Sequence, residues 1–275
     1  MEIQTDGAVS ITPIPSPKNG DEKRRFDKWW LLLLFVVFLI AYLSITKSDP
    51  YWRIILFVRD GIWVSLSTTV ISFLLVLVVG LLVGLGRLSK SKVINGISTV
   101  YVEVIRGIPL LVQLLFWYFA FPSVVQAIGN SLNIEALKNY LANPVGMAIL
   151  GLTFCYAAYM AEIYRAGIQS IPKGQMEAAR SLGMSHFESM RYVILPQAVR
   201  IILPPVGNEF ISLLKDSSLV SVVAVADITR RGREFMAANF IPLETWTMVA
   251  LLYLTMTLFS ARIVTFIEHK TRLER

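Results

Sequence analysis

Apolar residues in this chain are grouped in long runs that show neither the 3.6-residue period of a surface helix nor the alternation of a strand. Each run has about 17 residues or more, which is enough for a helix to cross the hydrocarbon core of a bilayer. The pattern predicts an all-α, polytopic membrane protein. Its six expected transmembrane helices are at 29–45, 61–86, about 98–121, 145 to about 163, 193–214 and 243–267.

The first apolar run raises a choice between a membrane anchor and a cleaved signal peptide. Residues 1–28 are mostly polar and carry prolines at 13, 15 and 17, a composition that predicts a disordered tail. A signal peptide has an apolar core of about 7–15 residues and a small-x-small cleavage site. This run instead continues into Thr-Lys-Ser-Asp-Pro at 46–50, so we expect an additional N-terminal transmembrane helix at 29–46.

Composition and charge agree with a membrane protein. Hydrophobic residues make up 55% of the chain and charged residues 16%, against about 25% charged in soluble domains. The net charge of +7 does not indicate nucleic-acid binding, because the basic residues form no dense patch with aromatic residues. They lie between the apolar runs, where they report membrane topology.

Basic residues are retained on the cytoplasmic side of a membrane. With the N-terminus inside, the inner segments hold 14 Lys and Arg residues and the outer segments seven. This distribution predicts that both termini are cytoplasmic, including the tail at 268–275. The basic cluster at 229–233 is on the outer side and opposes the rule, so we expect it to pack into protein.

The polar loop at 171–196 has the signals of two short helices. Pro172 suits a helix start, and Gly183 can adopt the left-handed conformation that ends one. Ser185 and Glu188 then have the spacing of a capping box, which starts a second helix. Pro196 marks where the next span begins or kinks. A rigid cytoplasmic hairpin is expected here.

The same loop resembles the cytoplasmic-loop signature of permeases of ATP-binding cassette importers. That signature is Glu-Ala-Ala, three residues, Gly, nine residues, and Ile-x-Leu-Pro; this chain has Val193 in place of the isoleucine. Segments 103–113, 171–175, 207–210 and 215–219 are similar to the polar amino acid branch of these permeases. The resemblance covers about 61–267 and implies a five-helix permease core, to which the N-terminal helix is a peripheral addition.

The resemblance implies a mechanism and a set of partners. The hairpin would dock on an ATPase subunit, through Gly174, Glu177, Ala178, Ala179, Gly183, Leu195 and Pro196. Two ATPases inside, an extracytoplasmic solute-binding protein, and a second permease subunit, identical or paralogous, would complete the transporter in the bacterial inner membrane. The substrate would be a polar or basic L-amino acid, or glutamine.

The residues exclude some activities of the chain itself. It has no phosphate-binding G-x-x-x-x-G-K-[ST] motif, no credible nucleophile and base, and no metal-ligand spacing around His186. We therefore expect no catalytic residue, metal site or cofactor. Three alternatives remain: a transporter or channel driven by an ion gradient, a membrane anchor or scaffold, and an ordinary amphipathic interfacial hairpin in place of the coupling loop.

Polar residues inside the spans are candidates for a substrate pathway, because a charge in mid-membrane costs roughly 2.5–3.5 kcal/mol. Glu209 lies below a Pro-Pro break and could bind an amino group, or pair with Arg200 or Lys215. Gly107 and Pro109 would bend the helix just after Arg106 and could present Arg106 to a substrate carboxylate. Alternatively, Arg106 could pair with Glu103 three residues earlier. The full candidate set is Arg106, Gln113, Asn208, Glu209, Lys215, Asp216, Ser217 and Ser218.

Three further polar sites have simpler interpretations. The segment 215–218 interrupts an apolar run and is expected to form either a gate or an interfacial turn. Glu162 and Arg165 are spaced for a structural ion pair. Cys155 is expected to be a small buried hydrophobe, and cannot form a disulfide within the chain because it is the single cysteine.

Overall fold

The computed structural model describes residues 28–271, which are helical apart from short connections. The tails predicted within 1–27 and 272–275 lie outside the described residues. The elements are α1 (Lys28–Thr46), α2 (Ser48–Arg87), α3 (Lys92–Gly107), α4 (Leu110–Leu115), the π-helical η1 (Phe116–Ala120), α5 (Phe121–Leu132), α6 (Glu135–Lys138), α7 (Pro144–Gln169), α8 (Lys173–Ser181), α9 (His186–Glu188), the π-helical η2 (Ser189–Ile194), α10 (Leu195–Asp216), the 3₁₀-helical η3 (Ser217–Val223), α11 (Ile228–Asn239) and α12 (Pro242–Thr271).

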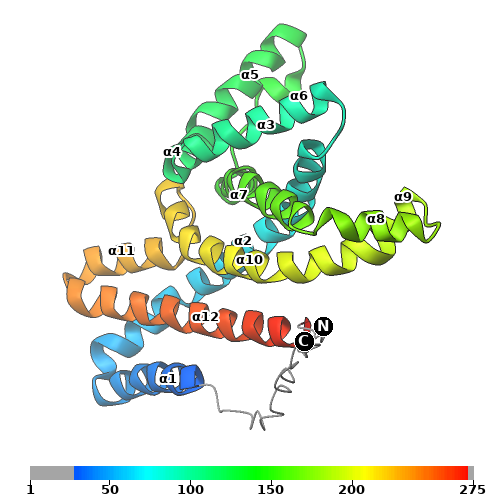
Figure 1. The fold of residues 1–275 in the computed structure, drawn as a ribbon. Coiled ribbons are helices and arrows are strands. Elements are labelled where there is room, and N and C mark those ends of the chain that lie inside the picture. Colours follow the sequence, from blue (N-terminus) through cyan, green and yellow to red (C-terminus); the bar gives the residue numbers. More distant parts are fainter. Residues whose placement is uncertain (1–27, 272–275) are drawn as a thin grey trace, which may run out of the picture.

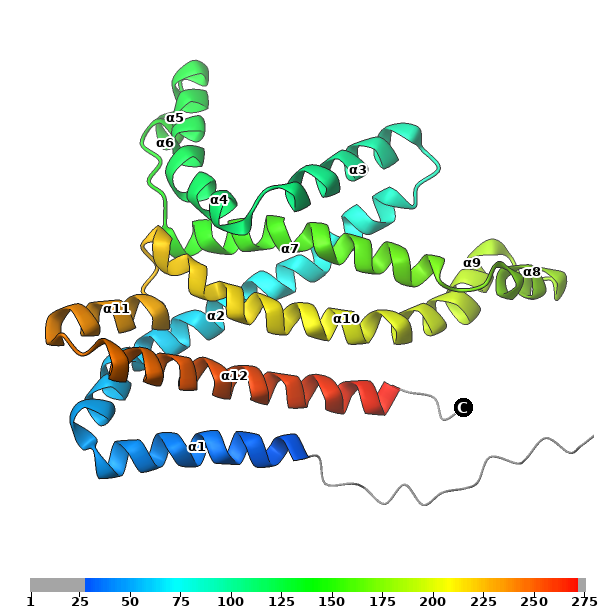
Figure 2. The same cartoon turned by 60° about the vertical axis from the view of Figure 1, so that its left-hand side comes forward.

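Two long helices, α2 and α7, form the centre of the molecule and run in the same direction (Figures 1 and 2). Small residues allow their backbones to approach closely. A Cβ on Gly80 would lie 2.7 Å from Met160, and one on Gly84 would lie 3.0 Å from the carbonyl oxygen of Ala161. Close approach of this kind is how helices gain packing energy in lipid, where no hydrophobic effect drives them together.

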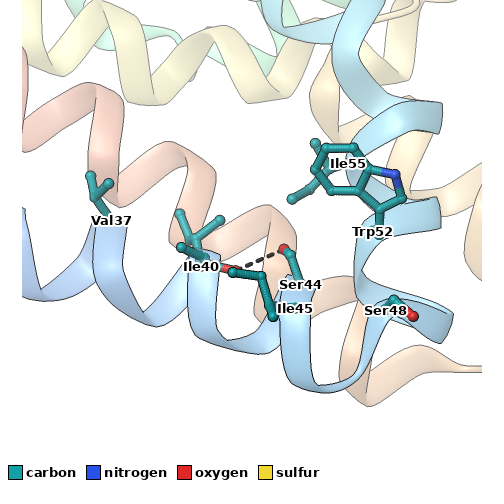
Figure 3. Close-up of a pocket in the computed structure, with 8 residues that line it drawn as sticks. Val37, Ile40, Ser44, Ile45, Ser48, Trp52 and Ile55 are labelled. Carbon is teal, nitrogen blue, oxygen red and sulfur yellow. Dashed lines mark hydrogen bonds between the residues drawn. The ribbon is translucent and has the colours of Figure 1, made fainter.

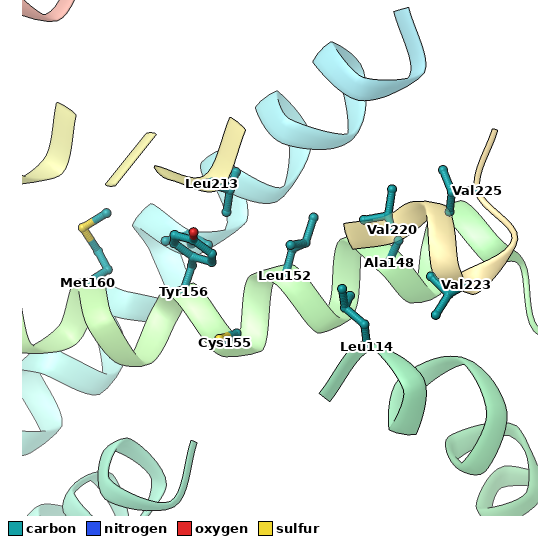
Figure 4. Close-up of a cluster of buried hydrophobic side chains, with 11 residues drawn as sticks. Leu114, Ala148, Leu152, Cys155, Tyr156, Met160, Leu213, Val220, Val223 and Val225 are labelled. Carbon is teal, nitrogen blue, oxygen red and sulfur yellow. The ribbon is translucent and has the colours of Figure 1, made fainter. Parts of the chain in front are cut away.

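Buried side chains of α4, α10 and η3 pack around α7, with Leu114 below the helix and Leu213 above it in Figure 4. Leu152 of α7 is fully buried together with Leu114 of α4, Leu213 of α10 and Val220 of η3. The shared cluster holds the interrupted segments α4 and η3 against the continuous helix α7. It therefore positions the polar residues that lie next to these interruptions.

Within residues 28–271, five helical stretches are long and apolar enough to cross a membrane. They are Trp29–Thr46, Ser48–Arg87, Leu110–Leu132, Pro144–Gln169 and Pro242–Lys270. The sixth predicted span, at 193–214, corresponds to α10, which packs against α7 and α12 but is not among the five. This helix carries Glu209, which is half-buried, and Arg200 and Asn208, which are exposed.

The predicted span at about 98–121 is wrong in its position. A helix breaks at Ile108 and Pro109, where both residues have extended backbone angles. Pro109 has no N–H to continue the hydrogen-bond ladder. The candidate span starts after the break, at Leu110, and continues through η1 to Leu132.

Two predicted boundaries are also corrected. Helix α2 starts at Ser48, well before the predicted 61, because its charged first turns find partners: Arg53 pairs with Asp49 at 3.1 Å, and Asp60 pairs with Arg231. At the other end of the chain, α12 continues to Thr271, beyond the predicted end at 267.

The ends of the elements fall on two sides of the bundle (Figure 2). The start of α1, the end of α12 and the hairpin of α8 and α9 lie at one end. The turn between α1 and α2, together with α11, lies at the opposite end. We call these the hairpin end and the far end.

The basic cluster at 229–233 lies in α11, and most of it packs against protein as predicted, whereas Arg233 is exposed. Arg230 and Arg231 both bind Glu234, and Arg231 also binds Asp60 of α2. Hydrogen bonds from Arg231 hold the pKa of the Glu234 carboxyl below its ordinary value. Gly232 lies buried against Val249 of α12.

Candidate functional site

The first half of the hairpin is α8, and it ends in a Schellman motif. Gly183 has φ +87°, its N–H donates to the carbonyl of Arg180 at 3.0 Å, and the N–H of Met184 donates to Ala179 at 3.3 Å. These two bonds satisfy carbonyls that the helix end leaves open, and the left-handed angle favours glycine. The predicted turn at Gly183 is confirmed.

The second half starts with the predicted capping box. The backbone N–H of Glu188 donates to the Ser185 hydroxyl at 3.2 Å, and the Ser185 N–H donates to the Glu188 carboxylate at 2.8 Å. The hydrogen bond from the Ser185 backbone N–H lowers the pKa of the Glu188 carboxyl, and the Ser185 hydroxyl adds to this effect. The reciprocal hydrogen bonds between Ser185 and Glu188 therefore fix where this helix starts.

The second helix is not a separate short element, which corrects the prediction. It continues from α9 through the π-helical η2 into α10. Pro196 sits in the first turn of α10. Since a proline cannot donate to the carbonyl four residues earlier, the wider π turn just before it accommodates the missing bond. The hairpin is thus a direct extension of α10.

The seven residues predicted to couple to the ATPase divide into one that is buried in the hairpin and six on the surface. Ala179 is buried, whereas the others are exposed: Gly174, Glu177, Ala178, Gly183, Leu195 and Pro196. Leu182 and Phe187, on either side of the turn, are 84% and 70% exposed. His186 is exposed as predicted. The base is anchored by a buried cluster that includes Ile171, Ile194 and Ile202.

The helix break before α4 is held by Gln113, which is buried. Its side-chain Nε2 donates to the carbonyls of Ile105 and Ile108, at 2.9 Å each. Pro109 would face the Ile105 carbonyl in a continuous helix and has no N–H to donate. Gln113 therefore replaces a backbone donor, and this position favours a structural role over direct contact with a substrate.

The spacing of Glu103 and Arg106 allows an ion pair, but the two side chains do not pair in the structure. Glu103 lies 3.9 Å from Arg87, which also binds Glu162 of α7. The guanidinium of Arg106 is exposed and lies 5.1 Å from the centre of the Tyr159 ring. The structural pair predicted between Glu162 and Arg165 is present.

Within residues 28–271, Glu209 forms no ion pair with Arg200 or Lys215. It is half-buried and interacts electrostatically with Asp216 and Arg106. Helix α10 thus places an acidic group within electrostatic range of Arg106, which lies in the last turn of α3. The neighbouring Asn208 is exposed.

Asp216 accepts a hydrogen bond from the Tyr156 hydroxyl at 2.6 Å. Sequence reasoning missed Tyr156 and Tyr159, because tyrosines in an apolar run carry no separate signal. Both lie on α7 and face the polar groups of α3 and α10.

The segment after α10 is a 3₁₀ turn within protein. The hydroxyl of Ser217 is buried and donates to Leu214 at 2.8 Å, and Ser218 is half-buried. Lys215 is exposed, on the opposite side of the chain from buried Leu213 and Leu214. Cys155 is buried and free. No group of three potential metal ligands occurs in residues 28–271.

Relatives of this chain are amino acid permeases. The glutamine transport system permease protein GlnP of Escherichia coli K12 is 39% identical over 222 residues, with 81% of this chain and 96% of GlnP covered. The arginine transport system permease protein ArgU of Corynebacterium glutamicum is 34% identical over 266 residues, with 94% of this chain and 84% of ArgU covered. The match to ArgU includes α1, because the 6% of this chain that it leaves out is shorter than the segment that precedes α1.

The fold also matches a solved structure described as the crystal structure of an amino acid ABC transporter with histidines. The TM-score is 0.70 at 36% identity, and the match covers 83% of this chain and 97% of that one. Residues 76–273 match the family of binding-protein-dependent transport system inner membrane components. This chain therefore belongs to that family, as the permease subunit of an ATP-binding cassette importer in the inner membrane.

Proposed function

We propose that this permease carries a polar amino acid, of the class that includes glutamine and arginine, and that its hairpin receives the force of ATP hydrolysis from a separate ATPase. The observation that carries the proposal is the hairpin itself. A rigid turn closed at Gly183 presents exposed residues at one end of the bundle, and its second helix is continuous with α10. The proteins named as glutamine and arginine permeases support the substrate class.

The continuity gives a route for force. A push on the hairpin moves α9, η2 and α10 together, because no loop interrupts them and α10 continues through Pro204 and Pro205, where the sequence predicted a break. Helix α10 carries Glu209 near the middle of its length and ends at Asp216. Motion at the hairpin therefore reaches both acidic residues. We infer that this is how ATPase closure changes access to the substrate pathway.

The pathway is proposed to lie between α3, α7 and α10. Arg106 suits a substrate carboxylate, and Glu209 suits an amino group or a cationic side chain. Tyr156 holds Asp216 in place through its hydroxyl. Gln113 and Ser217 have their donors engaged by backbone carbonyls, so we assign them to the framework of the pathway.

The orientation follows from charge and from geometry. The start of α1 and the end of α12 share the hairpin end, and the basic segments 87–97 and 169–196 lie there as well. We place this end and both termini in the cytoplasm. The far end, with α11, then faces the binding protein. One hairpin per chain requires a second permease subunit to engage two ATPases.

The proposal is tested by reconstituting the permease with its ATPase and binding protein in liposomes. Uptake of radiolabelled glutamine and arginine should require ATP inside and the binding protein outside. Uptake driven by a proton or sodium gradient without ATP would instead favour the alternative of an ion-gradient transporter.

A further inference from the structure

A groove separates the second half of α1 from the start of α2 at the far end (Figure 3). It is lined by Val37, Ile40 and Ala41 of α1, and by Trp52 and Ile55 of α2, with a volume of about 610 Å³. Figure 3 shows Trp52 and Ile55 across from Ile40. This volume lies within the range of roughly 300–1,000 Å³ that is typical of small-molecule sites.

The groove arises from the connection between the two helices. Only Lys47 separates α1 from α2, and the two diverge from this corner while α1 packs against α12. The small Ala41 and Ser44 leave space along the inner face of α1. Ser44 donates its hydroxyl to the Ile40 carbonyl at 2.7 Å, so its polar group is satisfied and the wall of the groove is effectively apolar.

Both helices that form the groove are candidate membrane spans. An apolar groove that opens to the hydrocarbon of a bilayer cannot hold water at low cost, because water there finds no polar partners. An acyl chain has the matching chemistry. The rim then decides which lipid supplies that chain.

The rim carries one positive charge that is not neutralised. Within residues 28–271, Lys47 forms no ion pair, and its side chain is exposed. The nearby Asp49 is paired with Arg53 at 3.1 Å, and Arg53 also donates to Asn239. A cation at the edge of an apolar groove is complementary to an anionic headgroup above an acyl chain.

We propose that the groove between α1 and α2 binds an anionic phospholipid of the leaflet at the far end. One acyl chain lies along Val37, Ile40 and Ile55. The headgroup phosphate lies at Lys47, which connects α1 to α2 next to the lining residue Ser48. The lipid fills the wedge between the added helix and the permease core. The site thus gives α1, which lies outside the five-helix core, a ligand of its own.

Native mass spectrometry of the full chain in detergent tests the site, with added phosphatidylglycerol or phosphatidylethanolamine. The wild type should retain one phosphatidylglycerol in preference to phosphatidylethanolamine. Val37→Trp should abolish this retention by filling the groove. The matched Val78→Trp, at an exposed position of α2 outside the groove, should retain the lipid.

Lys47→Gln should lower phosphatidylglycerol retention about fivefold, the size expected for one basic residue near an anionic surface. Retention of phosphatidylethanolamine should not change. Equal retention of both lipids by the wild type would overturn the proposal and leave an ordinary annular lipid only. Equal retention of the lipid by Val37→Trp and Val78→Trp would also overturn the proposal. Loss of the lipid when the transporter assembles would overturn it as well, and would indicate that a partner protein occupies the groove.

Discussion

The hairpin and the polar pathway are built in opposite ways. The hairpin is organised by residues within a few positions of each other: Gly183 with Arg180, and Ser185 with Glu188. The pathway is assembled from distant segments, with Tyr156 bound to Asp216 and Glu209 facing Arg106. The comparison teaches that the part proposed to receive force is locally encoded, whereas the part proposed to meet substrate depends on how whole helices pack.

The largest effect is expected from a change in the hairpin, the locally encoded region. Gly183→Val places a β-branched residue at φ +87°, a strain of about 1–3 kcal/mol. This corresponds to roughly a fivefold to 150-fold loss of the correctly closed hairpin. ATP-dependent uptake in liposomes should fall by a similar factor, while membrane insertion is unchanged.

The control for this change is Gly96→Val, which makes the same substitution in α3. A Cβ at Gly96 meets no atom within 4 Å, and its φ is ordinary for a helix. Uptake by this variant should stay close to that of the wild type. Normal uptake by Gly183→Val would remove the hairpin from coupling.

The second prediction concerns the pathway, the region assembled from distant segments. Glu209→Gln removes a charge-assisted contact to a cationic amino acid, which is worth about 1.5–3 kcal/mol. Uptake of arginine should fall about tenfold or more, and uptake of glutamine much less. Glu135→Gln, at an exposed acidic residue of α6, should affect neither. Equal losses for both substrates would exclude Glu209 from the substrate site.

The third prediction separates framework from substrate contact. Gln113→Leu leaves the Ile105 and Ile108 carbonyls without their side-chain donor, at a cost of about 1–3 kcal/mol. The melting temperature should fall, and uptake of all substrates should fall by the same factor. A change in the ratio of arginine to glutamine uptake would instead place Gln113 at the substrate.

The smallest effect is expected from the helix cap. Ser185→Ala removes one half of the capping box, which costs about 1 kcal/mol. Hydrogen exchange of the Glu188 amide should become faster, and uptake should fall only a few-fold. Ser181→Ala, which removes a hydroxyl bonded to its own helix, is the matched control. Unchanged exchange at Glu188 would contradict the capping role.

The sequence predicted the locally encoded hairpin better than the parts of the structure that are assembled from distant segments. The turn at Gly183 and the box at Ser185 were predictable because their determinants are short-range. The start of the third span was not, because the pattern of apolar residues runs through Pro109 and does not reveal that Gln113 supports a break there. The early start of α2 depends on Arg231, far along the chain, and no local pattern records that pair.

The pathway residues show the same limit. Glu209 was recognised because a charge inside an apolar run is costly. The tyrosines of α7 were not recognised, because Tyr156 and Tyr159 contact polar groups only once α3 and α10 pack against α7.

The central claim is that the hairpin contacts an ATPase, and cross-linking tests it most directly. Leu182→Cys places a thiol at the exposed tip, in a chain whose single native cysteine is buried. With a thiol-to-amine cross-linker, the account predicts a product between permease and ATPase whose yield changes with ATP. Leu141→Cys, equally exposed in the loop before α7, should give none. A Leu182→Cys permease that assembles with its ATPase, yet yields no such product, would contradict the account.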